Sequence, residues 1–231
     1  MANNQDIVNC IECKKKSRCF QNLVSDELEF VNKHKVQIEY LRGETICKYG
    51  SFASTVFYIV DGIVKVYLEG ADHKTLTVII LRSGEFLGLA SLYEGDTYFY
   101  TATALKDTVI CSIEKESMRK LIRLNGEFAS NIMSWYCMNF GHLFDKLRSF
   151  GFKHVNGRVA DVLLYLDRPE FREHKLYSYL NRKDIAEIAG IPAESLIRVL
   201  SDFSSDGIVK TGTNSIKILK PEMLSRISRG G

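Results

Sequence analysis

The sequence predicts an α+β fold in which a β-sandwich or jelly roll is followed by a long helix and a small winged helix-turn-helix domain. Residues 36–113 alternate between apolar and polar side chains with period two and are interrupted by glycines. Residues 127–150 then carry apolar side chains at helical spacing without a proline. Residues 180–207 contain two short helical patterns joined by a turn, which is typical of a helix-turn-helix.

The composition is that of a globular protein. The chain has 231 residues, 45% hydrophobic and 26% charged, which is enough for two domains with separate cores. No apolar run approaches a membrane span, and the start lacks the basic-then-apolar order of a signal peptide, so we expect a cytoplasmic protein. The net charge is only +3, and residues 155–231 hold 12 Lys and Arg against 10 Asp and Glu. Composition alone therefore does not indicate nucleic-acid binding.

Residues 1–24 are expected to form an arm that contains Cys10, Cys13 and Cys19 among several lysines and an arginine. The C-x2-C-x5-C spacing lets three sulfurs converge on one centre, and the neighbouring cations favour thiolates. Inside a cell, the six cysteines of the chain are expected to be thiols or metal ligands rather than a disulfide framework.

Residues 25–126 are expected to form the β-roll domain. A short helix is predicted over Val24–Lys33 with Ser25 as its N-cap. The strand candidates are rich in Val, Ile, Tyr, Phe and Thr; they are Thr55–Val60, Ile63–Tyr67, Thr75–Leu81 and Thr108–Ile113. Asp61-Gly62, between two apolar runs, predicts a hairpin turn.

Residues 127–154 are expected to form a long helix and a hinge. The helix is predicted over Glu127–Phe150, after an interruption at Asn125-Gly126, and the hinge over Gly151–Asn156. Apolar residues alternate by three and four along one face; they are Met133, Tyr136, Phe140, Leu143, Leu147 and Phe150. Such a seam could simply pack on the sandwich. Aromatic residues on other faces (Phe128, Trp135, Phe144) favour a helix covered on one side by its own domain and on the other by a twin chain. Cys47 and Cys137 lie among apolar residues, so we expect buried packing thiols.

Residues 155–231 are expected to form the winged helix-turn-helix domain. A helix is predicted over Gly157–Leu166. Asn181 can cap the first helix of the motif with Asp184 completing an imperfect capping box, Gly190 suits its left-handed end, and Pro192 suits the first turn of the next helix. Apolar residues at i, i+3, i+4 and i+7 give the second helix a buried face; they are Leu196, Val199, Leu200 and Phe203. Two short β runs, Ile208–Thr211 and Ser215–Leu219, then form a wing. The alternative is an ordinary helical hairpin.

The opposite face of the second helix offers side chains suited to DNA bases. Arg198 can donate two hydrogen bonds to guanine O6 and N7. Glu194, one turn earlier, can accept from a cytosine amine or orient Arg198, unless the two form only a surface ion pair. Ile197 suits a thymine methyl group. Candidates for phosphate contacts, which could also be ordinary surface residues, are Arg182, Lys183, Ser195 and Lys210.

The order of sandwich, long helix and winged helix resembles the Crp/Fnr regulators, related to the cyclic-AMP receptor protein and the fumarate–nitrate reduction regulator. The residues that carry the resemblance are Gly84-Glu85-Phe86-Leu87-Gly88 in the sandwich, and Lys183-Asp184-Ile185-Ala186, Gly190–Ser195 and Ile197–Leu200 in the DNA module. The resemblance implies a cyclic-nucleotide-binding-like domain and a homodimer that binds double-stranded DNA and contacts RNA polymerase. It also implies that Glu194 and Arg198 read the G·C pair of a TGA-containing half-site, whereas Ile197 replaces a smaller polar residue.

The resemblance also bears on the effector. In cyclic-nucleotide members a Glu follows the Gly-x-x-x-Gly turn and an Arg-Ser pair grips the phosphate, but the matching residues here are Leu89, Tyr98 and Phe99. Two aromatic rings leave the phosphate charge uncompensated, so we expect that cyclic AMP is not the effector. Leu89, Tyr98, Phe99 and Tyr100 could instead line an apolar pocket for a small ligand or haem, or belong to the core.

Oxygen-sensing members hold a [4Fe–4S] cluster with three N-terminal cysteines at C-x2-C-x5-C and a fourth in the sandwich. Cys10, Cys13 and Cys19 have that spacing, and Cys111 matches the fourth ligand. Free thiols and structural zinc are the alternatives. A cupin-like metal enzyme is disfavoured because the five histidines are scattered and no catalytic motif occurs, so we do not expect an enzyme.

Overall fold

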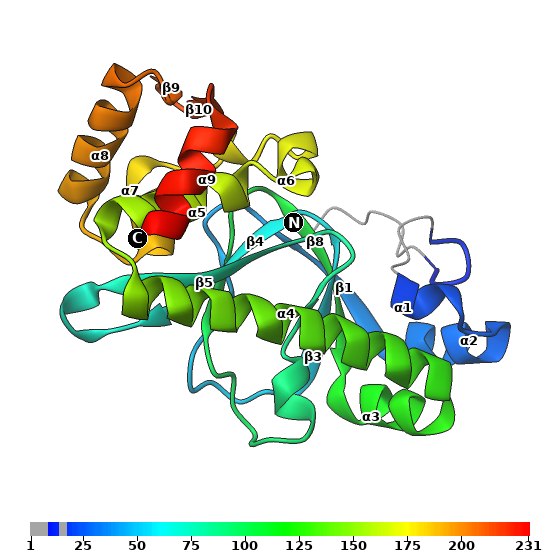
Figure 1. Ribbon diagram of the computed structural model, residues 1–231. Coiled ribbons are helices and arrows are strands. Elements are labelled where there is room, and N and C mark those ends of the chain that lie inside the picture. Colours follow the sequence, from blue (N-terminus) through cyan, green and yellow to red (C-terminus); the bar gives the residue numbers. More distant parts are fainter. Residues whose placement is uncertain (1–8, 14–17) are drawn as a thin grey trace. The chain divides into compact units, whose positions relative to one another are not determined.

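The computed structural model describes residues 9–13 and 18–231 and divides into two compact units (Figure 1). The first unit runs to Glu69 and continues from Ile80 to Phe140, and the second joins Gly70–Ile79 to Gly141–Gly231. Within the described ranges, no helix is both long and apolar enough to cross a membrane.

The β-strands before α3 (Lys115–Leu124) form a roll of two four-stranded sheets, which confirms the predicted sandwich class. The first sheet has the order β1 (Lys35–Tyr40), β8 (Thr108–Glu114), β3 (Thr55–Asp61), β6 (Phe86–Leu87). The second has the order β2 (Thr45–Cys47), β7 (Thr101–Ala104), β4 (Ile63–Glu69), β5 (Thr75–Arg82). All four predicted strands are confirmed, each extended at its end by one or two residues.

The hairpin predicted at Asp61-Gly62 is wrong, because β3 and β4 lie in different sheets. Gly62 turns the chain from one sheet to the other with a φ of 141°. A Cβ at this position would lie 2.3 Å from Oγ1 of Thr108, so the turn also requires the close approach that only glycine permits. An Asp-Gly pair between apolar runs fits both a hairpin within one sheet and a turn between two sheets, so the sequence does not distinguish them.

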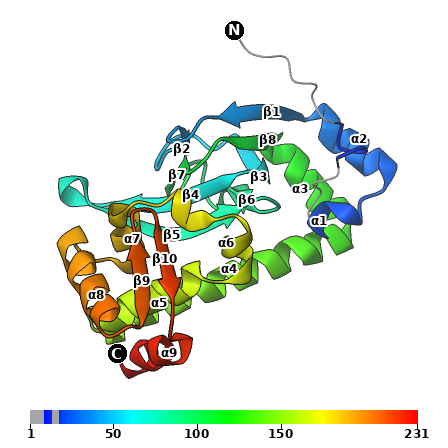
Figure 2. The same cartoon turned by 90° about the horizontal axis from the view of Figure 1, so that it is seen from above.

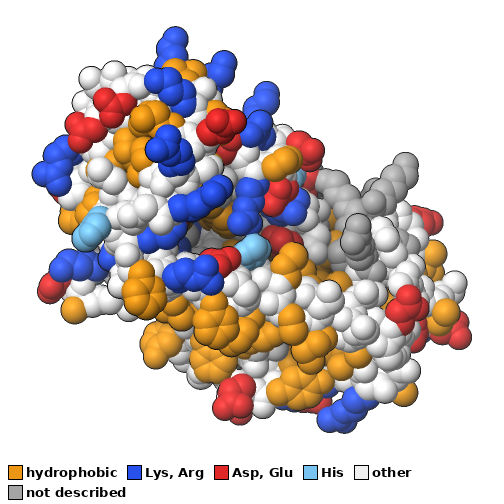
Figure 3. Space-filling model, viewed as in Figure 1, with side chains coloured by type: hydrophobic (Ala, Val, Ile, Leu, Met, Phe, Trp, Pro, Cys, Tyr) orange, Lys and Arg blue, Asp and Glu red, His pale blue; other side chains and the backbone are white. Residues whose placement is uncertain are grey.

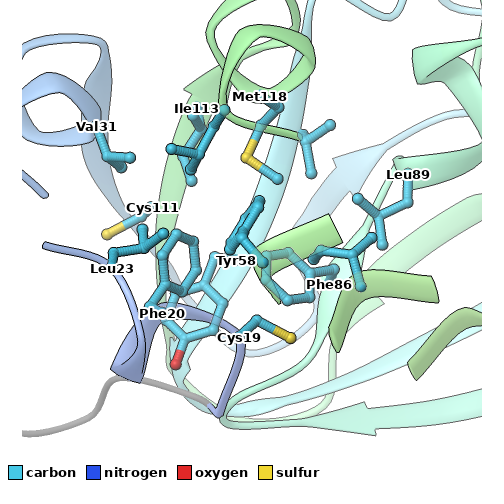
Figure 4. Close-up of a cluster of buried hydrophobic side chains, with 14 of the residues drawn as sticks. Cys19, Phe20, Leu23, Val31, Tyr58, Phe86, Leu89, Cys111, Ile113 and Met118 are labelled. Atoms are coloured by element: carbon cyan, nitrogen blue, oxygen red, sulfur yellow. The ribbon is translucent and has the colours of Figure 1, made fainter. Parts of the chain in front are cut away.

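Helices cover one end of the roll and close its core. Short helix α1 (Arg18–Gln21) inserts Phe20, whose ring centroid lies 5.0 Å from that of Tyr58 and 5.6 Å from that of Phe86. Helices α2 (Ser25–Lys33) and α3 (Lys115–Leu124) contribute further buried side chains to this cluster (Figure 4). The N-cap of α2 is Val24 rather than the predicted Ser25, since Glu27 accepts a hydrogen bond from the Val24 N–H at 3.0 Å.

The long helix α4 (Gly126–Phe152) begins where predicted. Asn125 interrupts α3, and its side-chain oxygen accepts from the Phe128 N–H at 2.9 Å. The helix runs two residues beyond the predicted end, so the predicted hinge narrows to Lys153 and His154 before α5 (Val155–Leu166). At the C-terminal end of α4, the Phe150 carbonyl accepts a hydrogen bond from Nη2 of Arg158 at 2.6 Å. Cys47 is buried as predicted, but the prediction for Cys137 is wrong because its side chain is exposed on α4.

The second unit contains the winged helix-turn-helix (Figure 2). After α5 and α6 (Pro169–Glu173) come the motif helices α7 (Arg182–Ala189) and α8 (Ala193–Ser205). The wing is an antiparallel pair, β9 (Val209–Gly212) and β10 (Ser215–Ile218), and α9 (Pro221–Gly230) packs on α5. The predicted order of helices and wing is confirmed. The described residues also include three short 3-10 turns, Ala71–His73, Leu89–Leu92 and Leu176–Ser178.

Candidate nucleic-acid interface and effector site

The turn between α7 and α8 is fixed by caps. The Asn181 side chain accepts from the Asp184 N–H at 2.9 Å, and the Asp184 carboxylate accepts from the Asn181 N–H at 3.0 Å. These reciprocal bonds complete the capping box that the sequence predicted to be imperfect. Gly190 ends α7 in the left-handed region, with a φ of 63°. Pro192 is the N-cap of α8 instead of a first-turn residue, because α8 begins at Ala193.

Helix α8 has one buried and one exposed face, as its spacing predicts. The four apolar residues of its inner face are each at most 3% exposed; they are Leu196, Val199, Leu200 and Phe203. Glu194, Ile197 and Arg198 lie on the exposed face, and the Ile197 side chain is 56% exposed. In the described part of the chain no ion pair joins Glu194 to Arg198. Both charged groups are therefore available to an external partner.

The candidates for phosphate contacts differ in how firmly they are held. The Arg182 guanidinium donates from Nη2 to the Gly212 carbonyl at 2.7 Å, which ties the start of α7 to the wing. Lys183 is exposed, with Nζ 3.9 Å from Oε1 of Glu187 in a surface pair. Ser195 is half-buried near the start of α8, and Lys210 is exposed on β9.

A hollow of about 460 Å³ lies between α8 and the wing. Ile197, Arg182 and Thr211 line it together with three serines of α8, Ser201, Ser204 and Ser205. Ser204 and Ser205 were not among the predicted contact residues. Their spacing of seven and eight residues from Ile197 places them on the same helix face, which is the sequence signal that could have found them.

In the roll, the residues predicted to surround an effector are bonded to the protein itself. The Gly88 N–H donates to the Tyr100 hydroxyl at 2.7 Å, and the Tyr98 hydroxyl donates to the Thr55 carbonyl at 2.9 Å. A Cβ on Gly88 would lie 3.0 Å from the Tyr98 ring. Leu89 is buried, whereas Phe99 is 42% exposed. Three of the four predicted lining residues are therefore packed into the domain.

The ionisable groups around these tyrosines are held neutral. Burial raises the pKa of both the Tyr98 and Tyr100 phenols, and it raises the pKa of the Cys47 thiol to about 12. All three groups therefore stay protonated well into the alkaline range.

The structure brings three of the four predicted cysteine ligands together. Cys10, Cys13 and Cys111 line one small cavity of about 30 Å³, and Nζ of Lys35 lies 3.9 Å from Sγ of Cys111. Burial outweighs the lysine and raises the pKa of the Cys111 thiol to about 11. Across residues 9–13 and 18–231, no group of three or more His, Cys, Asp or Glu side chains is arranged to hold a metal ion.

Cys19 does not join this group. It is 5% exposed and belongs to the hydrophobic cluster around Phe20. Figure 4 shows the sulfurs of Cys19 and Cys111 pointing to opposite sides of that cluster. The described conformation therefore does not assemble four thiolates around one centre.

A β-roll, a long helix and a winged helix-turn-helix with an exposed α8 together define a DNA-binding transcription regulator with an effector domain. Comparison with known families agrees: the "Cyclic nucleotide-binding domain" model matches residues 37–125, and the "Crp-like helix-turn-helix domain" model matches residues 157–227. The chain belongs to the Crp/Fnr family of transcription regulators. Regulators of this family bind DNA and act as dimers.

The chain is similar to characterised regulators over most of its length. It is 24% identical to the cyclic AMP receptor protein of Thermus thermophilus, covering 94% of this chain and 99% of that protein. It is 22% identical to the CRP-like cAMP-activated global transcriptional regulator of Mycobacterium tuberculosis, covering 91% of this chain and 96% of that protein.

Solved structures show the same fold. FixK2 from Bradyrhizobium japonicum superposes with a TM-score of 0.72 at 23% identity, covering 84% of this chain and 96% of that one. A putative Crp/Fnr regulator from Eubacterium rectale gives a TM-score of 0.73 at 18% identity, covering 92% and 98%.

Proposed function

We propose that this regulator acts as a homodimer on a two-fold DNA site with TGA-like half-sites, which it reads through Glu194, Ile197 and Arg198. The observation that carries the proposal is the exposed face of α8, where both charged side chains stand unpaired above a fully buried apolar face. Arg198 would donate to guanine, Glu194 would accept from a cytosine amine, and Ile197 would contact a thymine methyl. We expect the protein to act in the cytoplasm and to contact RNA polymerase.

The surface of α4 supports a dimer. Met133, Phe140 and Leu147 are each more than half exposed. With their neighbours they form the orange patch that follows α4 in Figure 3. A continuous apolar patch on a helix indicates a protein interface. Of the aromatic residues predicted on other faces of the helix, Phe128 and Trp135 pack in the hydrophobic cluster of the roll, whereas Phe144 is 56% exposed and joins the patch.

The first test is the substitution Arg198→Ala. It should weaken binding to a TGA-containing site by about 1–3 kcal/mol and leave binding to random DNA almost unchanged. Fluorescence anisotropy at fixed salt measures both affinities. Arg123→Ala, an exposed change in the first unit, is the matched control and should alter neither. Equal losses on both DNAs would mean that Arg198 contacts phosphate, which would contradict the proposal.

We also propose that cyclic AMP is not the effector. The support is that Leu89, Tyr98 and Phe99 stand where cyclic-nucleotide members carry a Glu and an Arg-Ser pair, and that the Gly88 N–H is already bonded to Tyr100. A cyclic phosphate would meet aromatic rings without a cation. Isothermal calorimetry should detect no cyclic AMP binding in the micromolar range, and micromolar binding would contradict the proposal.

Thiol-based sensing is a candidate for the signal that controls this regulator, because Cys10, Cys13 and Cys111 share one cavity. A [4Fe–4S] cluster needs a fourth ligand, and Cys19 would have to leave the hydrophobic cluster to supply it. The four-thiolate set therefore does not fit the described conformation. Iron and sulfide analysis of anaerobically prepared protein tests the cluster, and an iron-free protein would reject it. An absorption spectrum of the same sample tests haem.

A further inference from the structure

A cavity of about 320 Å³ lies in the second unit, apart from the DNA-reading face. Its walls come from the last turns of α4, from α5, from the end of α7, from Ser228 of α9 and from the Val78-Ile79 segment of β5. Every lining residue belongs to the second unit. The volume is that of a site for a small organic molecule.

The walls of this cavity are positively charged. Five basic side chains and two acidic ones line it. One acid, Asp161, is fully engaged, because it accepts from Lys153 Nζ at 2.8 Å, from Ser149 Oγ at 2.6 Å and from Ser228 Oγ at 2.5 Å. The other acid, Asp145, forms a surface ion pair in which its Oδ1 lies 3.8 Å from Nη2 of Arg148. Each acid is thus matched by one cation.

Three cations are left without an acid. Lys146 donates only to the neutral Thr77 carbonyl. Arg158 donates from Nη2 to the Phe150 carbonyl at 2.6 Å and from Nε to the Lys153 carbonyl at 3.0 Å, which satisfies the end of α4. Within the part of the chain that the structure describes, no carboxylate pairs with Lys146, Arg158 or Arg168. Partly buried charges without a counter-charge are unfavourable, and burial lowers the pKa of Lys146 to about 8.

An apolar surface adjoins these cations. The Phe150 ring lies beneath two of them: its centroid is 5.5 Å from Lys146 Nζ and 5.6 Å from Arg158 Cζ. Tyr165 and Ile188 form part of the remaining wall. Figure 3 shows basic side chains and a histidine gathered where the surface beside α4 is hollowed. The cavity therefore combines positive charge with room for an apolar body.

We propose that this cavity binds a small organic anion, in which a carboxylate or phosphate on a ring-sized apolar body meets Lys146 and Arg158. The proposal goes beyond the DNA-reading function and adds a ligand site distinct from the predicted effector pocket at Leu89, Tyr98, Phe99 and Tyr100. Because one molecule would contact α4, α5 and α7 together, its binding would stabilise the unit that carries α8. A ligand that binds the folded state in this way would raise the unfolding temperature as its concentration rises.

Calorimetry with four probes tests the site. Phenyl phosphate and benzoate carry both the charge and the ring, whereas inorganic phosphate carries only charge and benzyl alcohol only a ring. Both ring anions should bind, and each single-feature probe should bind about ten-fold more weakly or not at all. Lys146→Met should weaken phenyl phosphate about ten-fold, and the exposed control Lys33→Met should not. If neither ring anion binds, or if the single-feature probes bind equally well, the proposal is wrong.

Chemical labelling locates the site without a substitution. Acetic anhydride labels accessible lysines, and peptide mass spectrometry measures each one. Phenyl phosphate should protect Lys146 and leave Lys33 unprotected, and unprotected Lys146 at saturating probe would overturn the proposal. Arg198→Ala should bind the probe as the unsubstituted protein does, so failure of the DNA-reading proposal is distinguishable from failure of this one.

Discussion

The winged helix-turn-helix and the β-roll use their polar side chains in opposite ways. On α8, Glu194 and Arg198 are exposed and form no ion pair with each other. In the roll, the hydroxyls of Tyr98 and Tyr100 bond to the protein's own backbone, and burial raises the pKa of both phenols. A surface that binds an external polyanion needs unpaired donors, whereas an interior whose donors are engaged offers little to a charged ligand. The contrast separates the proposed DNA-reading surface of α8 from the interior of the β-roll.

The largest expected effect is a difference in stability between substitutions at two neighbouring residues of α8, Leu196 and Ile197. Leu196→Ala removes a side chain that is 0% exposed and should lower the free energy of unfolding by about 2–5 kcal/mol. Ile197→Ala changes an exposed side chain and should lower it by less than about 0.5 kcal/mol, while altering the preferred base sequence. Urea titrations and a binding-site selection measure the two properties. Similar stability losses in both variants would contradict the division of faces.

An effect of intermediate size tests the neutral interior of the roll. The pKa of the Cys47 thiol is raised to about 12 when folded, so its contribution to stability is present below pH about 8.5 and is lost as the pH rises toward 12. Between these pH values the free energy of unfolding falls as the pH rises, and Cys47→Ala should make that slope shallower by up to about 1.4 kcal/mol per pH unit. Urea titrations at a series of pH values measure the slope. The exposed Cys137→Ala should leave the slope unchanged, and an unchanged slope in Cys47→Ala would refute the neutral interior.

The smallest expected effect concerns the bond to Gly88. Tyr100→Phe removes the hydroxyl that accepts from the Gly88 N–H and should lower the free energy of unfolding by about 1 kcal/mol. Thermal unfolding followed by circular dichroism measures the change. Tyr93→Phe alters a side chain that is 65% exposed and should have no effect. If the two variants behave alike, the Gly88 donor is satisfied by some other group.

Local patterns predicted α2, the longer helices α4 and α5, the two motif helices, four strands and the wing, because periodicity and caps act over a few residues; α1, α6 and α9 were not predicted. They could not predict that β3 and β4 lie in different sheets, since Asp61-Gly62 suits either turn. The spacing of Cys10, Cys13 and Cys19 permits convergence but does not decide it. Phe20 packs in the core, and Cys19, the residue before it, is buried with it.

The exposure of Cys137 and the charged cavity have a different cause. Cys137 lies among apolar residues that face outward on α4, and a sequence pattern does not distinguish an interface between chains from a core. The cavity draws side chains from five separate elements, from Val78 in β5 to Ser228 in α9, so no sequence window contains them together. The proposed base-reading residues were accessible to sequence reasoning because they share one helix face.

The bond from Arg182 to the Gly212 carbonyl has an entropic consequence. Holding a long side chain still in a complex costs about 0.5–1.5 kcal/mol of lost rotamer freedom. Arg182 is already anchored before DNA arrives, whereas the exposed side chains of Lys183 and Lys210 have no comparable anchor to the backbone. A phosphate that meets Arg182 therefore meets a preorganised donor, and this arginine can fix where the helix and the wing sit on the sugar–phosphate backbone.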